Sequence, residues 1–165
     1  MKHLALVVAA LSLVVGERAF AADWKQFPVS SSASGTAGIA AKASGIVDDR
    51  HGTRAAQLVV SCSDGRTSVF ISAEYLVFGG DVVRVEYTID QGAARRGYWN
   101  VCAGDLCAGL WNGASIPFVE ALLDAATLRM RMTRAFGEPI SLAFDVQGAR
   151  QALTEVRRQC GWPTR

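Results

Sequence analysis

Residues able to act in nucleophilic or acid–base catalysis are few in this sequence. His51 is the only histidine after residue 21, and no G-x-S-x-G segment is present. A serine or cysteine nucleophile usually needs a histidine base that a third group positions. We therefore interpret His51 as a solvated histidine in a charged loop, residues 48–54, rather than as a catalytic base.

The carboxylates offer a second kind of chemistry. Asp48 and Asp49 are adjacent in that loop, and Glu86 and Asp90 lie on the same face of an expected strand. A glycosidase needs two carboxylates about 5–10 Å apart across a cleft. Arg84 shares the strand face of Glu86, which favours ion pairing between strands instead. We therefore expect that the protein is not an enzyme. A hydrolase that uses Asp48, Asp49 or Glu86 is the alternative.

The four cysteines are Cys62, Cys102, Cys107 and Cys160. An even number in an exported chain indicates two disulfides, for which three pairings are open. The four residues between Cys102 and Cys107 resemble a turn, so we expect this pair to form one bridge and Cys62–Cys160 the other. The sequence has no C-x-x-C, and its cysteine spacing is not that of a zinc site. We expect no metal and no cofactor.

The N-terminus predicts a destination for the chain. A basic start is followed by a mostly apolar run, residues 4–15, and by Ala19-Phe20-Ala21. These are the three parts of a secretory signal peptide, which we expect to be cleaved after Ala21. The run of about twelve residues is shorter than the roughly twenty of a membrane-spanning helix, so an uncleaved anchor is the weaker alternative. We expect residues 22–165 to form one domain, periplasmic or secreted, without a membrane span.

The charge of residues 22–165 limits the class of partner. Fifteen basic and fourteen acidic residues give a net charge near +1. A protein that binds nucleic acid or an anionic membrane usually has a strong basic field. We therefore expect a protein partner in the envelope and no nucleic acid, and the oligomeric state stays open.

Strands and two helices should position these residues. Apolar and polar residues alternate, as is typical of strands with one buried face, in segments 58–62, 83–90, 128–133 and 140–145. Asp64-Gly65 predicts a hairpin turn before a strand at 67–72, and 98–101 is a further candidate. One helix should begin with Ser115 as its cap, and a second should run from Asp145 to Gly161. We predict an α+β fold, mainly an antiparallel β-sheet or sandwich with two packed helices, the second at the C-terminus.

Aromatic residues gather around the short cysteine loop. They are Tyr98, Trp99, Trp111 and Phe118. Tyrosine and tryptophan contribute much of the binding energy at protein interfaces, so this segment is a candidate interaction surface. The alternative is that these rings fill the core of a small domain.

Several short motifs together resemble a known family. They are Trp24, LVVSC at 58–62, VEYTID at 85–90, Trp99, IPFV at 116–119, FDVQG at 144–148 and QCGW at 159–162. This set is similar to the periplasmic accessory proteins of type VI secretion, the VasI/TagO-like group. The resemblance implies a non-enzymatic periplasmic accessory of a secretion apparatus. The pair Cys102 and Cys107 is not part of that pattern, and the resemblance implies no binding residues.

Three functions follow from these observations. The first is a non-enzymatic periplasmic binding or accessory protein that assists a type VI-like secretion apparatus or another envelope assembly. The second is a periplasmic inhibitor of a lysozyme- or protease-type hydrolase, because a small disulfide-linked domain with one rigid loop suits that task. The third is an unrecognised hydrolase.

Overall fold

The computed structural model describes residues 23–31, 34–74, 76–134 and 138–162. The predicted signal peptide, residues 1–21, lies outside the described residues. Within them, no helix is long and apolar enough to cross a membrane.

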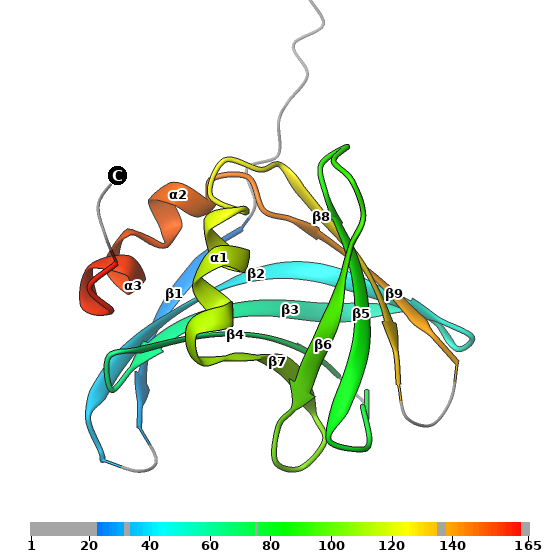
Figure 1. The fold of residues 1–165 in the computed structure, drawn as a ribbon, viewed down its shortest axis with the longest axis horizontal. Helices are drawn as coiled ribbons and strands as arrows, with labels where there is room; N and C mark the ends of the chain where they lie inside the picture. Colours follow the sequence, from blue (N-terminus) through cyan, green and yellow to red (C-terminus); the bar gives the residue numbers. More distant parts are fainter. Residues whose placement is uncertain (1–22, 32–33, 75, 135–137, 163–165) are drawn as a thin grey trace, which may run out of the picture.

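The described chain is built mainly of antiparallel strands (Figure 1). The strands are β1 (Lys25–Ser30), β2 (Ala37–Asp49), β3 (Gly52–Ser63), β4 (Arg66–Ala73), β5 (Val82–Ile89), β6 (Arg95–Val101), β7 (Cys107–Trp111), β8 (Thr127–Thr133) and β9 (Ile140–Asp145). Their order in the sheet is β1-β2-β3-β4-β7-β6-β5-β8-β9, and β9 also pairs with β2. Eight strands, β2 to β9, therefore close into a barrel.

The long strand β2 makes this closure possible. Its first half, from Ala37 to Lys42, pairs with β1. Its second half, from Gly45 to Asp48, pairs with β9. Both neighbours lie on the same side of β2, one after the other. β1 is therefore an extra strand beside the barrel, and β9 completes the ring.

The barrel interior is filled by alternate residues of every strand. Its largest fully buried side chains include Leu58, Ile71, Trp99, Leu128, Met132 and Ile140. Helix α1 (Ser115–Glu120) follows the short 3-10 helix η1 (Asn112–Ala114) and adds Phe118 to this core. Figure 1 shows α1 in front of β3 and β4. Buried side chains of the described residues therefore fill the inside of the barrel.

Helices α2 (Ala149–Ala152) and α3 (Thr154–Gln159) follow β9, and α3 contacts β2 and β3. The disulfide Cys62–Cys160 joins β3 to the end of α3, with 5.6 Å between the two Cα atoms. This is one of the two bridges expected from the sequence. It attaches the C-terminal helices covalently to the barrel.

The structure contradicts the predicted fold class. A sheet or sandwich with two packed helices is wrong, because the strands close on themselves and the described chain has three short α-helices. The expected second helix is divided at Leu153 into α2 and α3. Alternation along a strand shows which side chains share a face, but it does not say which strands pair. Closure of the sheet is therefore not visible in the pattern.

Several local predictions can be compared with the structure. The Asp64-Gly65 hairpin is confirmed, since both residues have positive φ angles, 51° and 67°, between β3 and β4. The charged loop 48–54 is instead the end of β2, a tight turn and the start of β3. Ser115 does not cap α1; its hydroxyl is buried and donates to the Thr67 carbonyl at 2.6 Å.

Candidate interaction surface

The four aromatic residues expected at a binding surface do not lie together. Trp99 and Phe118 are buried inside the barrel, where their rings meet edge to face with 5.1 Å between centroids. The Tyr87 ring also meets Phe118 edge to face, with 5.1 Å between centroids. These rings fix α1 in the barrel, and Trp99 and Phe118 are not available to a partner.

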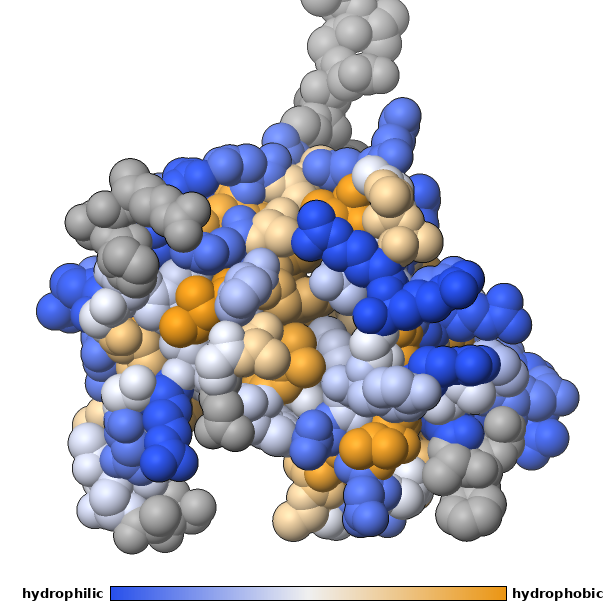
Figure 2. Space-filling model, viewed as in Figure 1, coloured by the Kyte–Doolittle hydropathy of each residue, from blue (hydrophilic) through white to orange (hydrophobic). Residues whose placement is uncertain are grey.

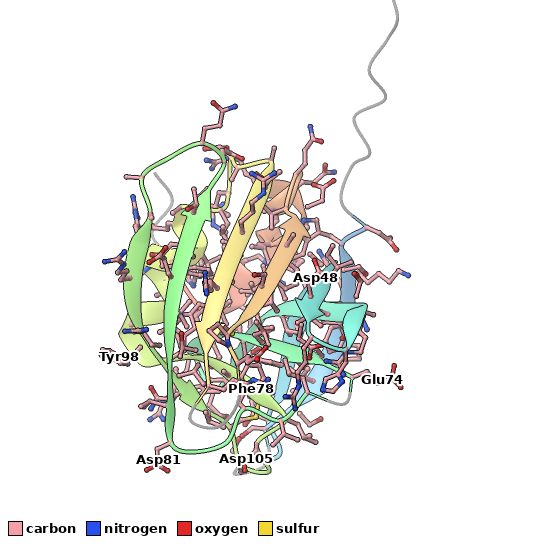
Figure 3. All side chains as sticks on the ribbon, turned by 90° about the vertical axis from the view of Figure 1, so that its right-hand side faces the viewer. Asp48, Glu74, Phe78, Asp81, Tyr98 and Asp105 are labelled. Atoms are coloured by element: carbon pink, nitrogen blue, oxygen red, sulfur yellow. A yellow bond between two sulfur atoms is a disulfide. The ribbon has the colours of Figure 1, made fainter. Side chains whose placement is uncertain are left out.

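Tyr98 and Trp111 lie on the outside of the barrel. Tyr98 is 68% exposed, more than any other large apolar or aromatic side chain that the structure describes. In Figure 3 it projects from β6, away from the barrel. Trp111 is half-buried on β7 and packs against Phe70, with 5.8 Å between the ring centroids. Of the four predicted residues, Tyr98 is the one that a partner can reach most fully.

The short cysteine loop is closed as expected. Cys102 and Cys107 form a disulfide, and the Cys102 backbone N–H donates to the Cys107 carbonyl at 2.9 Å. The Asp105 N–H donates to the Cys102 carbonyl at 3.0 Å. Gly104 and Asp105 both have positive φ angles, which allow the chain to reverse within these few residues. The side chain of Leu106, which follows this turn, is 58% exposed.

A second loop, residues 76–81, is held against the cysteine loop. The Phe78 N–H donates to the Asp105 carbonyl at 2.9 Å, and the Phe78 side chain is buried. The Val101 N–H donates to the Asp81 carbonyl at 2.8 Å, just before β5 begins. Two loops that are distant in sequence are therefore tied together by backbone hydrogen bonds at one end of the barrel.

Exposed apolar side chains gather at this end, which we call the tip. The tip consists of Val77 (52% exposed), Val82 (48%) and Leu106 (58%). Figure 2 shows apolar side chains between hydrophilic ones at this lower end. The carboxylates of Asp81 and Asp105 project from the same end in Figure 3. The tip is therefore an apolar area with an acidic border.

The carboxylates considered for hydrolysis are engaged in other contacts. Asp49 forms an ion pair with Arg54, and a hydrogen bond from the His51 backbone N–H holds the pKa of Asp49 below its usual range. Asp48 accepts a hydrogen bond from the Thr53 hydroxyl. Glu86 forms an ion pair with Arg96 at 2.6 Å. All three carboxylates are therefore engaged in ion pairs or hydrogen bonds within the protein.

The distance between these carboxylates also matters. Glu86 pairs across the sheet with Arg131, Arg131 with Ser141, and Ser141 with Asp48. Three steps between strands separate the backbones of Glu86 and Asp48 by about 14 Å. Both residues line one hollow on the outer face of the sheet. His51 is exposed in the turn between β2 and β3, where its Nε2 accepts from Arg50 Nε at 3.0 Å.

Within the described residues, no three side chains of His, Cys, Asp or Glu lie close enough together to hold a metal ion. The tip residues Val77, Val82 and Leu106 were not expected from the sequence. For the predicted aromatic surface, the sequence did contain a partial signal. Tyr98 and Trp99 are neighbours in a strand and must point to opposite faces. One of the two therefore had to lie outside.

Comparison with known proteins places this geometry in context. The model of a family described as type VI secretion system VasI, EvfG matches residues 16–162. No curated protein matches the chain significantly. The crystal structure of invasion associated protein B from Bartonella henselae has a TM-score of 0.55 with this chain at 14% identity, and the match covers 84% of this chain and 94% of that one. This likeness is one of fold.

Proposed function

The chain belongs to the VasI family of type VI secretion system proteins, and from that membership we propose a non-enzymatic accessory protein that binds a protein partner in the envelope through the tip. The protein is exported by its N-terminal leader and acts in the periplasm. Its two disulfides suit an oxidising compartment.

The observation that carries this proposal is the fixed exposure of Val77, Val82 and Leu106. Apolar side chains that are held in water favour burial against a partner. The disulfide Cys102–Cys107 and the hydrogen bond from Phe78 to Asp105 hold two of the three residues in place before binding. Little conformational entropy is then lost on association, which raises the affinity for a given contact area.

The engaged carboxylates support a role without catalysis. Asp49 and Glu86 are in ion pairs, and Asp48 accepts a hydrogen bond from the Thr53 hydroxyl. Rim carboxylates such as Asp81 and Asp105 instead suit a partner with basic residues around an apolar centre.

Photo-crosslinking in cells of the native host tests this proposal. A photoreactive phenylalanine analogue replaces Leu106 in one variant and Val82 in another, and Gln151, exposed on α2, serves as the matched control position. We expect both tip positions to capture the same subunit of the secretion apparatus, and the control position not to capture it.

A functional readout completes the test. Val77→Asp combined with Leu106→Asp should remove the crosslinked product and reduce type VI secretion, because both changes place charge in an apolar contact. Normal secretion and an intact envelope complex in this variant would overturn the proposal. Circular dichroism checks that the variant, whose changes are on exposed side chains, keeps its fold.

One observation favours a second function, the inhibition of a hydrolase. The Cys102–Cys107 loop is short, closed and carries the exposed Leu106 next to Asp105. A rigid loop of this kind can fill the cleft of a periplasmic lysozyme or protease. Replacing both cysteines by serine should then abolish inhibition while the fold remains, and unchanged inhibition would exclude the loop as the inhibitory element.

A further inference from the structure

The outer face of β5, β6 and β8 carries a concentration of positive charge. Glu86 is the one acidic residue in these three strands, beside five arginines. Four of the five are exposed on this outer face, which we call the arginine face: Arg84, Arg96, Arg129 and Arg131. Figures 2 and 3 show hydrophilic side chains gathered over these strands.

The pairing of the strands places these arginines around a single carboxylate. Glu86 lies directly between Arg96 on β6 and Arg131 on β8. Glu86 and Arg96 form an ion pair at 2.6 Å. Among the described residues, Arg84, Arg129 and Arg131 have no carboxylate within ion-pair distance. Like charges on neighbouring strands repel each other, so three arginines remain to be neutralised from outside.

The arginine face is hollowed where the unpaired side chains meet. A hollow of about 410 Å³ is lined by Arg84, Arg96 and Arg131 together with Glu86 and Thr133. A second hollow of about 290 Å³ shares Glu86 and Arg131 with the first and is also lined by Arg129 and Ser141, among others. Guanidinium groups bind carboxylates through two parallel hydrogen bonds, and the nearby hydroxyl of Thr133 adds a further donor.

The spacing of three arginines indicates the form of the ligand. Arg84 lies level with Thr133, Arg131 lies two residues further along β8, and Arg129 two residues beyond that. Each step is about 6.8 Å along the strands. In an extended peptide, side chains on one face repeat with the same spacing, every second residue. We propose that the arginine face binds an extended acidic segment of a protein partner, with carboxylates at alternate positions.

The charge around the arginine face favours a protein segment over an anionic membrane. Glu86 lies within the face and Asp48 borders the second hollow. Asp81 and Asp105 project from the adjoining end of the barrel (Figure 3). A membrane surface with uniform negative charge would meet these carboxylates with repulsion, whereas a peptide can place its acidic residues against the arginines alone.

Binding of synthetic peptides to the intact, disulfide-bonded protein tests this site. The probe is a fluorescent peptide of about eight residues in which Glu and Thr alternate, so that all its carboxylates share one face. A second peptide of the same composition has its glutamates in one block, and a third has Gln in place of Glu. Vesicles that contain phosphatidylglycerol test the membrane alternative.

We expect the alternating peptide to bind most tightly, and its affinity to fall as salt is added. Arg131→Gln should weaken binding by roughly tenfold or more, because a charge-assisted double hydrogen bond is lost. Arg66→Gln, which removes the same charge from the exposed start of β4, is the matched control and should change the affinity by less than about twofold.

Three outcomes would overturn the proposal: no binding of the alternating peptide, equal binding of the block peptide, or equal effects of the two arginine substitutions. Binding of the vesicles in place of the peptide would assign the face to a membrane instead. The arginine face does not include the tip residues, so this result is independent of the crosslinking test.

Discussion

At the scale of single residues, several carboxylates of this protein accept hydrogen bonds or form ion pairs within the fold. Asp90 is the clearest example. Its Oδ1 accepts hydrogen bonds from the N–H groups of Ala126 and Thr127 at 2.9 and 2.8 Å, which joins the end of β5 to the beginning of β8. These backbone donors stabilise the ionised form and hold the pKa of Asp90 below its usual range.

Asp90 should therefore contribute to the pH dependence of stability. A lowered pKa in the folded state means that the contribution is complete above the unfolded pKa of about 4 and is lost as the pH falls through the folded value. Asp90→Asn should lower the urea midpoint at pH 7, and the difference from the wild type should shrink between about pH 5 and pH 2. Asparagine tolerates the positive φ of 51° at this position. A difference that is the same at every pH would contradict this assignment.

The residue scale also explains why the predicted aromatic surface separated. Tyr98 and Trp99 are consecutive in β6, and a strand sends consecutive side chains to opposite faces. Trp99 therefore points into the barrel, where it contacts Phe118, and Tyr98 points to the solvent. Alternation within the sequence contained this information, although it did not show which of the two rings lies inside.

At the scale of elements, two disulfides hold the loops and helices to the barrel in different ways. Cys62–Cys160 connects β3 to α3 across 98 residues of sequence. Cys102–Cys107 spans 5 residues and connects the end of β6 to the start of β7. The larger loop restricts the unfolded chain far more than the smaller one.

Removing each disulfide should therefore destabilise the protein by different amounts. Replacing Cys62 and Cys160 by serine should lower the free energy of unfolding by about 5 kcal/mol, and replacing Cys102 and Cys107 by about 2 kcal/mol. Urea denaturation of the two double variants measures both values. A larger loss from the short loop would show that the tip, and not the attachment of the C-terminal helices, limits the stability of the fold.

At the scale of the whole molecule, closure of the barrel depends on a close approach between β2 and β9. Gly45 pairs with Phe144, and a Cβ atom at this glycine would lie 2.2 Å from Phe144 Cδ1 and 2.5 Å from the Ala143 carbonyl oxygen. A side chain at this position would push the two strands apart. Glycine at residue 45 is therefore a condition for closing the ring.

Gly45→Ala should weaken the pairing between β2 and β9. We expect a loss of roughly 1–3 kcal/mol and faster hydrogen exchange of the amides in β9. Gly97→Ala is the matched control, because a Cβ there meets nothing within 4 Å and the residue also lies in a barrel strand. We expect it to change stability by less than about 0.5 kcal/mol. Equal effects of the two substitutions would show that the approach of β2 to β9 does not govern stability.

The net charge of residues 22–165 is near +1, but the charged side chains are distributed unevenly over the surface. Arg129 and Arg131 alternate with buried methionines in β8, and Arg84 alternates with buried valines in β5. The sequence thus placed each arginine on the outer face of its own strand. Only the order of the strands, with β5 between β6 and β8, brought the three groups together on one surface.

The sequence by itself determined the strands with one apolar face, the Asp64-Gly65 hairpin, the short cysteine loop and the resemblance to its family. All of these depend on neighbouring residues or on short motifs, whose geometry the backbone period dictates. Tertiary structure alone decided the closure of the barrel, the division of the C-terminal helix, and the gathering of the tip and the arginine face. These depend on which distant strands pair, and alternation is the same for an open and a closed sheet.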